Sequence, residues 1–203
     1  MTEFLVNGPG DAPVTLVLAH GAGAPMDSGF MEAFAVGLGD RGVRVVRFEF
    51  PYMRARRESG SRRPPDREAV LLNTWRDVVA ELGGHVAIGG KSMGGRMASM
   101  VAESVAARAL VCLGYPFHAP GRPDKPRVAH LRDLAVPALI VQGTRDPFGG
   151  RDDVAGYELS DAIRVHWVED GDHDLTPRKA AGSRDAAWAA AMDAVAAFLR
   201  ERA

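Results

Sequence analysis

Short apolar runs alternate with longer amphipathic segments along most of the chain, and this alternation constrains the fold more than any other feature. Six runs rich in Val, Ile and Leu have the length and composition of strands: 14–20, 43–48, 85–90, 109–115, 138–143 and 162–168. Several are apolar on both faces, which is typical of central strands in a parallel sheet. Apolar residues at helical spacing predict helices over 28–40, 66–82, 96–107 and the C-terminal segment.

This order predicts an α/β fold, in which right-handed crossovers build a mostly parallel sheet of about six to seven strands with helices on both faces. At 203 residues, the chain has the length of one domain, which we expect to span 1–203. The longest connection, 116–136, is too short for a sizeable lid. Asp66 is expected to cap the helix 66–82. Ligand sites in such sheets form just after the strands.

The bulk properties exclude several classes of protein. A net charge of -1 gives no general attraction to nucleic acid or to anionic membranes. The N-terminal residues lack the basic and apolar regions of a signal peptide, and no apolar run approaches the ~20 residues of a membrane span. We therefore expect a cytoplasmic protein. The single cysteine, Cys112, lies in an apolar run and is expected in the core. No metal-ligand spacing is present, so we expect neither a metal nor a cofactor.

Ser92 satisfies the strand-end rule. It follows the run 85–90 and precedes the helix 96–107, within the pattern Gly90-Lys91-Ser92-Met93-Gly94. This is G-x-S-x-G, a turn between strand and helix that exposes the serine hydroxyl. Glycines are needed there because Cβ atoms would collide with the neighbouring strand and helix. The pattern predicts a nucleophile, although serines also occur in ordinary glycine-rich turns.

A serine nucleophile needs a base that is held by an acid. Among six histidines, His173 fits best, because it lies in a polar loop between the last strand and the final helix. Asp146 follows the strand 138–143 and is the predicted acid. Asp170, Asp172 and Asp174 are close neighbours of the histidine in sequence and are poorly placed to reach its Nδ1. The order Ser92, Asp146, His173 is that of the α/β-hydrolase triad.

An acyl-transfer site also needs donors for an oxyanion. The backbone N–H of Met93, at the start of the helix after the serine, is one predicted donor. The second is expected from the loop that follows the strand 14–20, where glycines allow the backbone to approach a substrate. Ala22 N–H is the predicted donor, with Gly21 and Gly23 as alternatives.

Several blocks of sequence together resemble a family of small α/β-hydrolases. They are LAHGAGAPMDS, FEFPYM, RRPPDR, GKSMGGRMAS, GYPFHAPGRP, QGTRDPFG and DGDHDL. The family is related to the dienelactone-hydrolase-like enzymes, and it includes predicted bacterial hydrolases, a human testis-expressed protein and a regulatory subunit of the NSL acetyltransferase complex. The resemblance implies a nucleophile at Ser92, an acid at Asp146 and a base at His173. Dienelactone hydrolase uses a cysteine nucleophile, so the serine here argues against dienelactone as substrate.

These observations predict a serine hydrolase that acts on a small-molecule ester or thioester through an acyl-enzyme. A non-catalytic binding or scaffold protein on the same fold is the alternative, and cofactor-free perhydrolysis is a third. Tyr52, Phe117 and Lys91 are candidate substrate-binding residues, and Lys91 is an unusual cation beside the nucleophile. The segment 52–67 carries six arginines. It is interpreted either as a solvated loop or as a recognition site for an anionic substrate or partner.

Overall fold

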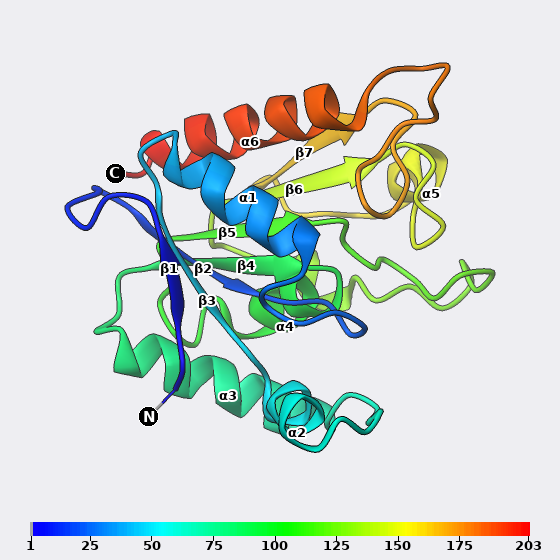
Figure 1. Cartoon of the computed structure of the whole chain (residues 1–203). Helices are drawn as coiled ribbons and strands as arrows, with labels where there is room; N and C mark the ends of the chain where they lie inside the picture. The colour runs from blue at the N-terminus through cyan, green and yellow to red at the C-terminus, as the bar shows by residue number, and fades with distance from the viewer. Residues whose placement is uncertain (1) are drawn as a thin grey trace.

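The computed structural model describes residues 2–203, and Met1 lies outside the described residues. Within these residues the chain forms a seven-stranded sheet with the order β1-β3-β2-β4-β5-β6-β7 (Figure 1). The strands are β1 (Leu5–Asn7), β2 (Thr15–Ala19), β3 (Arg44–Phe48), β4 (Ala87–Lys91), β5 (Ala109–Leu113), β6 (Ala138–Gly143) and β7 (Ile163–Val168). β1 pairs antiparallel with β3, and the other neighbouring strands are parallel. The predicted fold class is confirmed.

Helices cover both faces of this sheet. They are α1 (Gly29–Gly39), α2 (Pro51–Ser59), α3 (Glu68–Glu81), α4 (Met93–Val101), α5 (Arg151–Ala155) and α6 (Arg184–Arg200), with a 3₁₀ turn, η1 (Ala129–Leu131). Helices α1 and α6 lie together on one face, and α3 lies on the opposite face (Figure 1). The connections within residues 2–203 carry no sizeable lid, as the sequence predicts.

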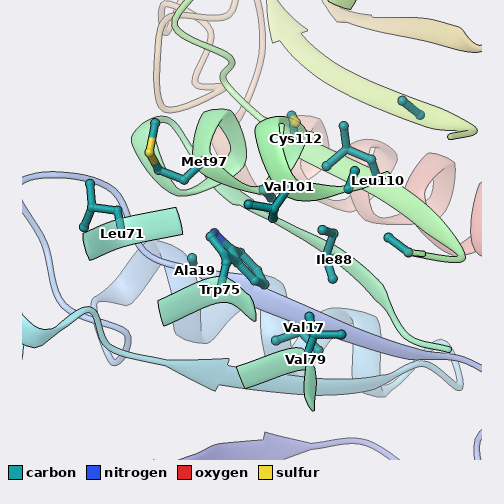
Figure 2. Packing of buried hydrophobic residues seen from close by; sticks show 14 of the residues in the cluster. Val17, Ala19, Leu71, Trp75, Val79, Ile88, Met97, Val101, Leu110 and Cys112 are labelled. Carbon is teal, nitrogen blue, oxygen red and sulfur yellow. The ribbon is translucent and has the colours of Figure 1, made fainter. Parts of the chain in front are cut away.

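The alternation of side chains along each strand divides the core between the two faces. On β2, Val17 packs in the cluster that contains Trp75 of α3, and Figure 2 shows these residues together. Leu16 belongs to the cluster that contains Phe34 of α1 and Leu199 of α6. Because both faces of the central strands are buried, their ends are fixed in space. Residues that follow these strands are consequently held at defined positions on one edge of the sheet.

Three details of the predicted elements need correction. Helix α4 begins at Met93 and not at 96, so it starts directly after Ser92. The segment 52–67, interpreted from the sequence as a solvated loop or a recognition site, is helical in its first half, because α2 has a proline in its first turn and a left-handed Gly60 at its end. Asp66 does not cap α3. Its Oδ2 accepts the main-chain N–H of Tyr52 at 2.9 Å.

Candidate active site

Ser92 is the single residue between β4 and α4, and its backbone is held in an unusual conformation. It has φ 51° and ψ -117°, and its N–H donates to the carbonyl oxygen of Leu113 at 3.0 Å. The glycines on both sides are sterically required. A Cβ at Gly90 would lie 2.3 Å from the Ala19 oxygen, and a Cβ at Gly94 would lie 2.5 Å from the same atom. The short turn between strand and helix therefore directs the Ser92 side chain away from the sheet.

The structure brings Ser92, His173 and Asp146 into one hydrogen-bonded chain. The Ser92 Oγ lies 2.9 Å from His173 Nε2, and His173 Nδ1 lies 2.8 Å from Asp146 Oδ2. An ionised carboxylate only accepts hydrogen bonds, so the shared proton lies on Nδ1. The other ring nitrogen, Nε2, then accepts from the serine hydroxyl. This is the tautomer that a general base at serine requires.

Two further donors hold the Asp146 carboxylate, which is buried with a fully inaccessible side chain. The N–H of Phe148 donates to Oδ1 at 2.8 Å, and Gln142 Nε2 donates to Oδ2 at 3.0 Å. Gln142 is itself buried, and its Oε1 accepts the N–H of Tyr115 at 2.7 Å. A buried charge is costly unless donors surround it. These bonds offset that cost and fix the carboxylate toward His173.

A cavity of about 350 Å³ opens beside this chain of residues. Ser92 and His173 line one side, and the loop after β2, including Ala22, lines another. Aromatic rings of Phe30 and Phe148 form apolar walls, and the Phe148 ring lies 4.3 Å from the His173 ring, centroid to centroid. A small apolar group has room to bind next to the serine hydroxyl.

A protein-family model matches most of this chain and agrees with its fold and with the geometry of the site. The model of the alpha/beta hydrolase domain family matches residues 12–200. This chain belongs to that family. The membership that the sequence motifs indicate is thereby confirmed.

Solved α/β-hydrolase structures superpose on almost the whole chain. A dienelactone hydrolase from Anabaena variabilis has a TM-score of 0.74 at 17% identity, and the alignment covers 98% of this chain and 91% of that one. An alpha-beta serine hydrolase homologue from Coxiella burnetii has a TM-score of 0.70 at 18% identity, with 98% and 91% covered. A lidless serine hydrolase, XC6422 from Xanthomonas campestris, has a TM-score of 0.68 at 17% identity, with 98% and 88% covered. At these identities the likeness shows a shared fold.

Lys91 of this α/β-hydrolase is buried and lines the cavity beside Ser92. Its Nζ donates to the carbonyl oxygen of His173 at 2.7 Å and lies 3.2 Å from a carboxylate oxygen of Asp174. The ring of Phe30 lies on another side, 5.3 Å from Nζ. Burial lowers the pKa of the Lys91 ammonium, and the Asp174 carboxylate opposes that change. The lysine therefore ties the histidine loop to the end of β4.

Two residues that were predicted to contact substrate do not line the cavity beside Ser92. Phe117 is fully buried in the core, since the chain turns inward after β5. Tyr52 is also buried, and its hydroxyl donates to the carbonyl oxygens of Gly21 at 3.3 Å and Ala22 at 3.0 Å. Tyr52 thus supports the loop after β2 from behind.

A buried histidine that sequence reasoning did not select supports the same loop. His20 Nε2 accepts the N–H of Phe50 at 3.1 Å, so Nδ1 carries the proton and donates to the Gly21 oxygen at 2.7 Å. Burial lowers the pKa of His20, which keeps the ring neutral. The bond to Phe50 joins the end of β2 to the chain that follows β3, and the bond to Gly21 holds the start of the loop after β2. The only sequence signal was the position of His20 at a strand end.

A second serine–histidine pair lies away from this cavity. Ser99 Oγ lies 2.8 Å from His130 Nε2, and the Ser99 hydroxyl donates to the carbonyl oxygen of Arg96 at 2.7 Å. Ser99 is only 3% exposed. Within residues 2–203 no carboxylate forms a hydrogen bond with His130. The pair has neither access to a substrate nor an acid, so it holds α4 against η1.

Residues 2–203 contain no group of His, Cys, Asp and Glu side chains that could hold a metal ion. None of the helices in the same range combines the length and apolar character that crossing a membrane requires.

Proposed function

We propose that this α/β-hydrolase is a serine hydrolase that cleaves a small ester or thioester through an acyl-enzyme. The observation that carries the proposal is the continuous hydrogen-bonded chain from Ser92 Oγ through His173 to the buried Asp146. The serine is at the cavity surface, the histidine has the required tautomer, and the carboxylate is fixed by neighbouring donors. The second serine–histidine pair, Ser99 and His130, has a buried serine and, within residues 2–203, no carboxylate bonded to its histidine.

In the proposed reaction, Ser92 Oγ attacks the substrate carbonyl while His173 Nε2 takes the hydroxyl proton. The tetrahedral intermediate collapses when the imidazolium returns that proton to the departing alcohol or thiol. Water then attacks the acyl-enzyme with His173 as base, which releases the acid and restores the serine. Asp146 holds the ring in place and stabilises the imidazolium without accepting its proton.

Backbone donors next to Ser92 are suited to the oxyanion of that intermediate. Met93 N–H is at the first position of α4, where amides have no partner within the helix. Ala22 belongs to the loop that lines the cavity opposite the serine. We assign these two N–H groups to the oxyanion site. Losing one such donor typically costs roughly 3–4 kcal/mol of transition-state stabilisation.

The size and lining of the cavity favour a small substrate. Its volume of about 350 Å³ is at the lower end of small-molecule sites, which are roughly 300–1,000 Å³. Phe30 and Phe148 offer apolar surface to a short acyl or alcohol group. The connections described above contain no long lid that would enclose a large lipid chain. An ester or a thioester is therefore proposed in preference to a peptide or a long-chain lipid.

Labelling with a fluorophosphonate probe tests the proposal, because this reagent reacts with activated serines. We expect wild-type protein to be labelled and Ser92→Ala to be unlabelled. Ser99→Ala is the matched control, since it removes the other histidine-bonded serine, and it should label like the wild type. Folding of each variant is checked by circular dichroism.

Other labelling results would point to a different function or to a different nucleophile. Folded wild-type protein that is not labelled would favour the alternative function, a binding or scaffold protein on a hydrolase fold. Labelling that is lost in Ser99→Ala and retained in Ser92→Ala would show that the nucleophile is Ser99 in α4 and not Ser92. A panel of p-nitrophenyl esters of increasing acyl length then defines the substrate size. An assay that detects peracid as a product distinguishes perhydrolysis from hydrolysis.

A further inference from the structure

A second cavity adjoins the one that contains Ser92. Its volume is about 360 Å³, and the residues that line it include Arg56, Arg62 and Arg63. Ala22 and Gly23 line both cavities. The loop after β2 therefore borders both the serine site and the cavity that the arginines line. A substrate that is bound at Ser92 and is long enough to pass this loop would enter the second cavity.

Among the described residues, Arg56, Arg62 and Arg63 have no acidic partner, whereas their neighbour Arg57 has two. Arg57 forms ion pairs with Asp27 at 2.9 Å and Glu49 at 2.6 Å. Across residues 2–203, by contrast, no carboxylate lies within 4.0 Å of a guanidinium nitrogen of Arg56, Arg62 or Arg63. Like charges gathered around a hollow repel one another, and an anion that enters the hollow relieves this repulsion.

The segment that carries these arginines is anchored at several points. Arg57 fastens α2 to the strand end after β3 through Glu49. Asp66 at the far end of the segment accepts the N–H of Tyr52, which joins it to the first turn of α2. Pro64 and Pro65 restrict the backbone just before that contact. The arginines therefore project from a closed and tethered segment beside the loop after β2.

We propose that Arg56, Arg62 and Arg63 bind an anionic group of the substrate, a carboxylate or a phosphate. Guanidinium groups suit this role because their planar donors pair with such oxygens two at a time. The inference rests on the proposed function of Ser92 and narrows its substrate class. The chain acts on esters or thioesters that carry negative charge at a distance from the scissile carbonyl.

The charge has two possible sources, the acyl part or the leaving group, and two pairs of substrates distinguish them. p-Nitrophenyl glutarate carries a carboxylate on its acyl part, and p-nitrophenyl pentanoate is its neutral counterpart of equal chain length. Acetyl-coenzyme A carries phosphates on its leaving group, and S-phenyl thioacetate is a neutral thioester. For each substrate the quantity compared is kcat/KM of a variant relative to wild type, which cancels differences in intrinsic reactivity.

The test variant combines Arg56→Gln, Arg62→Gln and Arg63→Gln. Its matched control combines Arg54→Gln, Arg76→Gln and Arg122→Gln, which removes the same charge from residues that line neither cavity. We expect the test variant to lower kcat/KM about tenfold or more on one anionic substrate and less than about twofold on its neutral counterpart. The control should change both by less than about twofold. Added salt should weaken the wild-type preference, because exposed charges are screened.

The outcomes separate this inference from the proposed function. If Ser92 is labelled but the test variant lowers activity on neutral and anionic substrates equally, the anion site is wrong and the hydrolase stands. If Ser92 is not labelled, calorimetric titration of wild-type protein and the test variant with monomethyl glutarate and with inorganic phosphate decides the anion site alone. Binding that the test variant loses supports the site. Equal binding, or no binding to either protein, overturns it.

Discussion

The Nζ atom of Lys91 donates a 2.7 Å hydrogen bond to the main-chain carbonyl oxygen of His173. This bond links the last residue of β4 to the loop after β7, so the serine and the histidine are held by one direct connection. Gly114 makes room for it. A Cβ at this residue would lie 2.6 Å from the His173 oxygen and 3.1 Å from Nζ.

We expect Lys91→Met to lower kcat about 10–100-fold, since small displacements of a catalytic group have effects of this size. KM for a small neutral ester should change little. Asp174→Asn removes the ion pair but keeps the hydrogen bond from Lys91 to the His173 carbonyl oxygen, so it should lower kcat less than Lys91→Met does. An unchanged kcat in folded Lys91→Met would exclude the positioning role.

Asp146→Asn should lower kcat by about 10⁴-fold while the protein remains folded, because an amide no longer fixes the Nδ1–H tautomer of the histidine. Steady-state hydrolysis of p-nitrophenyl acetate measures the loss. Asp152→Asn is the matched control, since this carboxylate is exposed on α5, and its kcat should equal that of wild type. Comparable activity in the two variants would remove Asp146 from the mechanism.

Two glycine substitutions test the steric account of the turn around Ser92. A Cβ at Gly94 would lie 2.5 Å and 2.6 Å from two main-chain oxygens, whereas a Cβ at Gly23 meets nothing within 4 Å. We expect Gly94→Ala to lower the free energy of unfolding by roughly 1–3 kcal/mol, as overpacking does. Gly23→Ala should leave it unchanged. Urea denaturation measures both, and equal stabilities would show that the backbone near Gly94 can adjust.

Buried His20 makes folding stability depend on pH. Burial lowers its pKa in the folded protein, so below about pH 6.5 the unfolded chain binds a proton that the folded chain does not. Stability should therefore fall as the pH decreases from 7 toward 5. For one such site the loss is about 1.4 kcal/mol per pH unit between the two pKa values. Urea denaturation should give a shallower pH dependence for His20→Gln, and identical slopes would contradict this assignment.

The sequence predicted the parallel sheet and the positions of the three residues of the proposed triad because strand ends are fixed by the apolar runs before them. Ser92 follows such a run directly, Asp146 and His173 lie in the short loops after two others, and the structure brings the three side chains together. The strand-end rule gives a position along the chain, but it does not give the direction of a side chain. For this reason it also selected Phe117, which points into the core.

Contacts between side chains and distant main-chain atoms were beyond sequence reasoning. The partner of Lys91 is the carbonyl of a residue 82 positions away, and no residue type identifies a carbonyl acceptor. The buried bonds of Tyr52 to the loop after β2 are of the same kind. Helix α2 was missed because its many arginines obscure the apolar spacing. Its proline at the start and glycine at the end were the available signals.

The backbone of Ser92 has a consequence for the history of chains with this turn. A non-glycine residue with φ 51° lowers the stability of the fold by about 1–3 kcal/mol, a cost that glycine does not have. A descendant that no longer needed the hydroxyl would gain stability by exchanging the serine for glycine. Folding alone therefore gives no reason to keep a side chain at this position. Under the proposed function, a serine at this position therefore marks relatives that still need the hydroxyl, and a glycine marks relatives that do not.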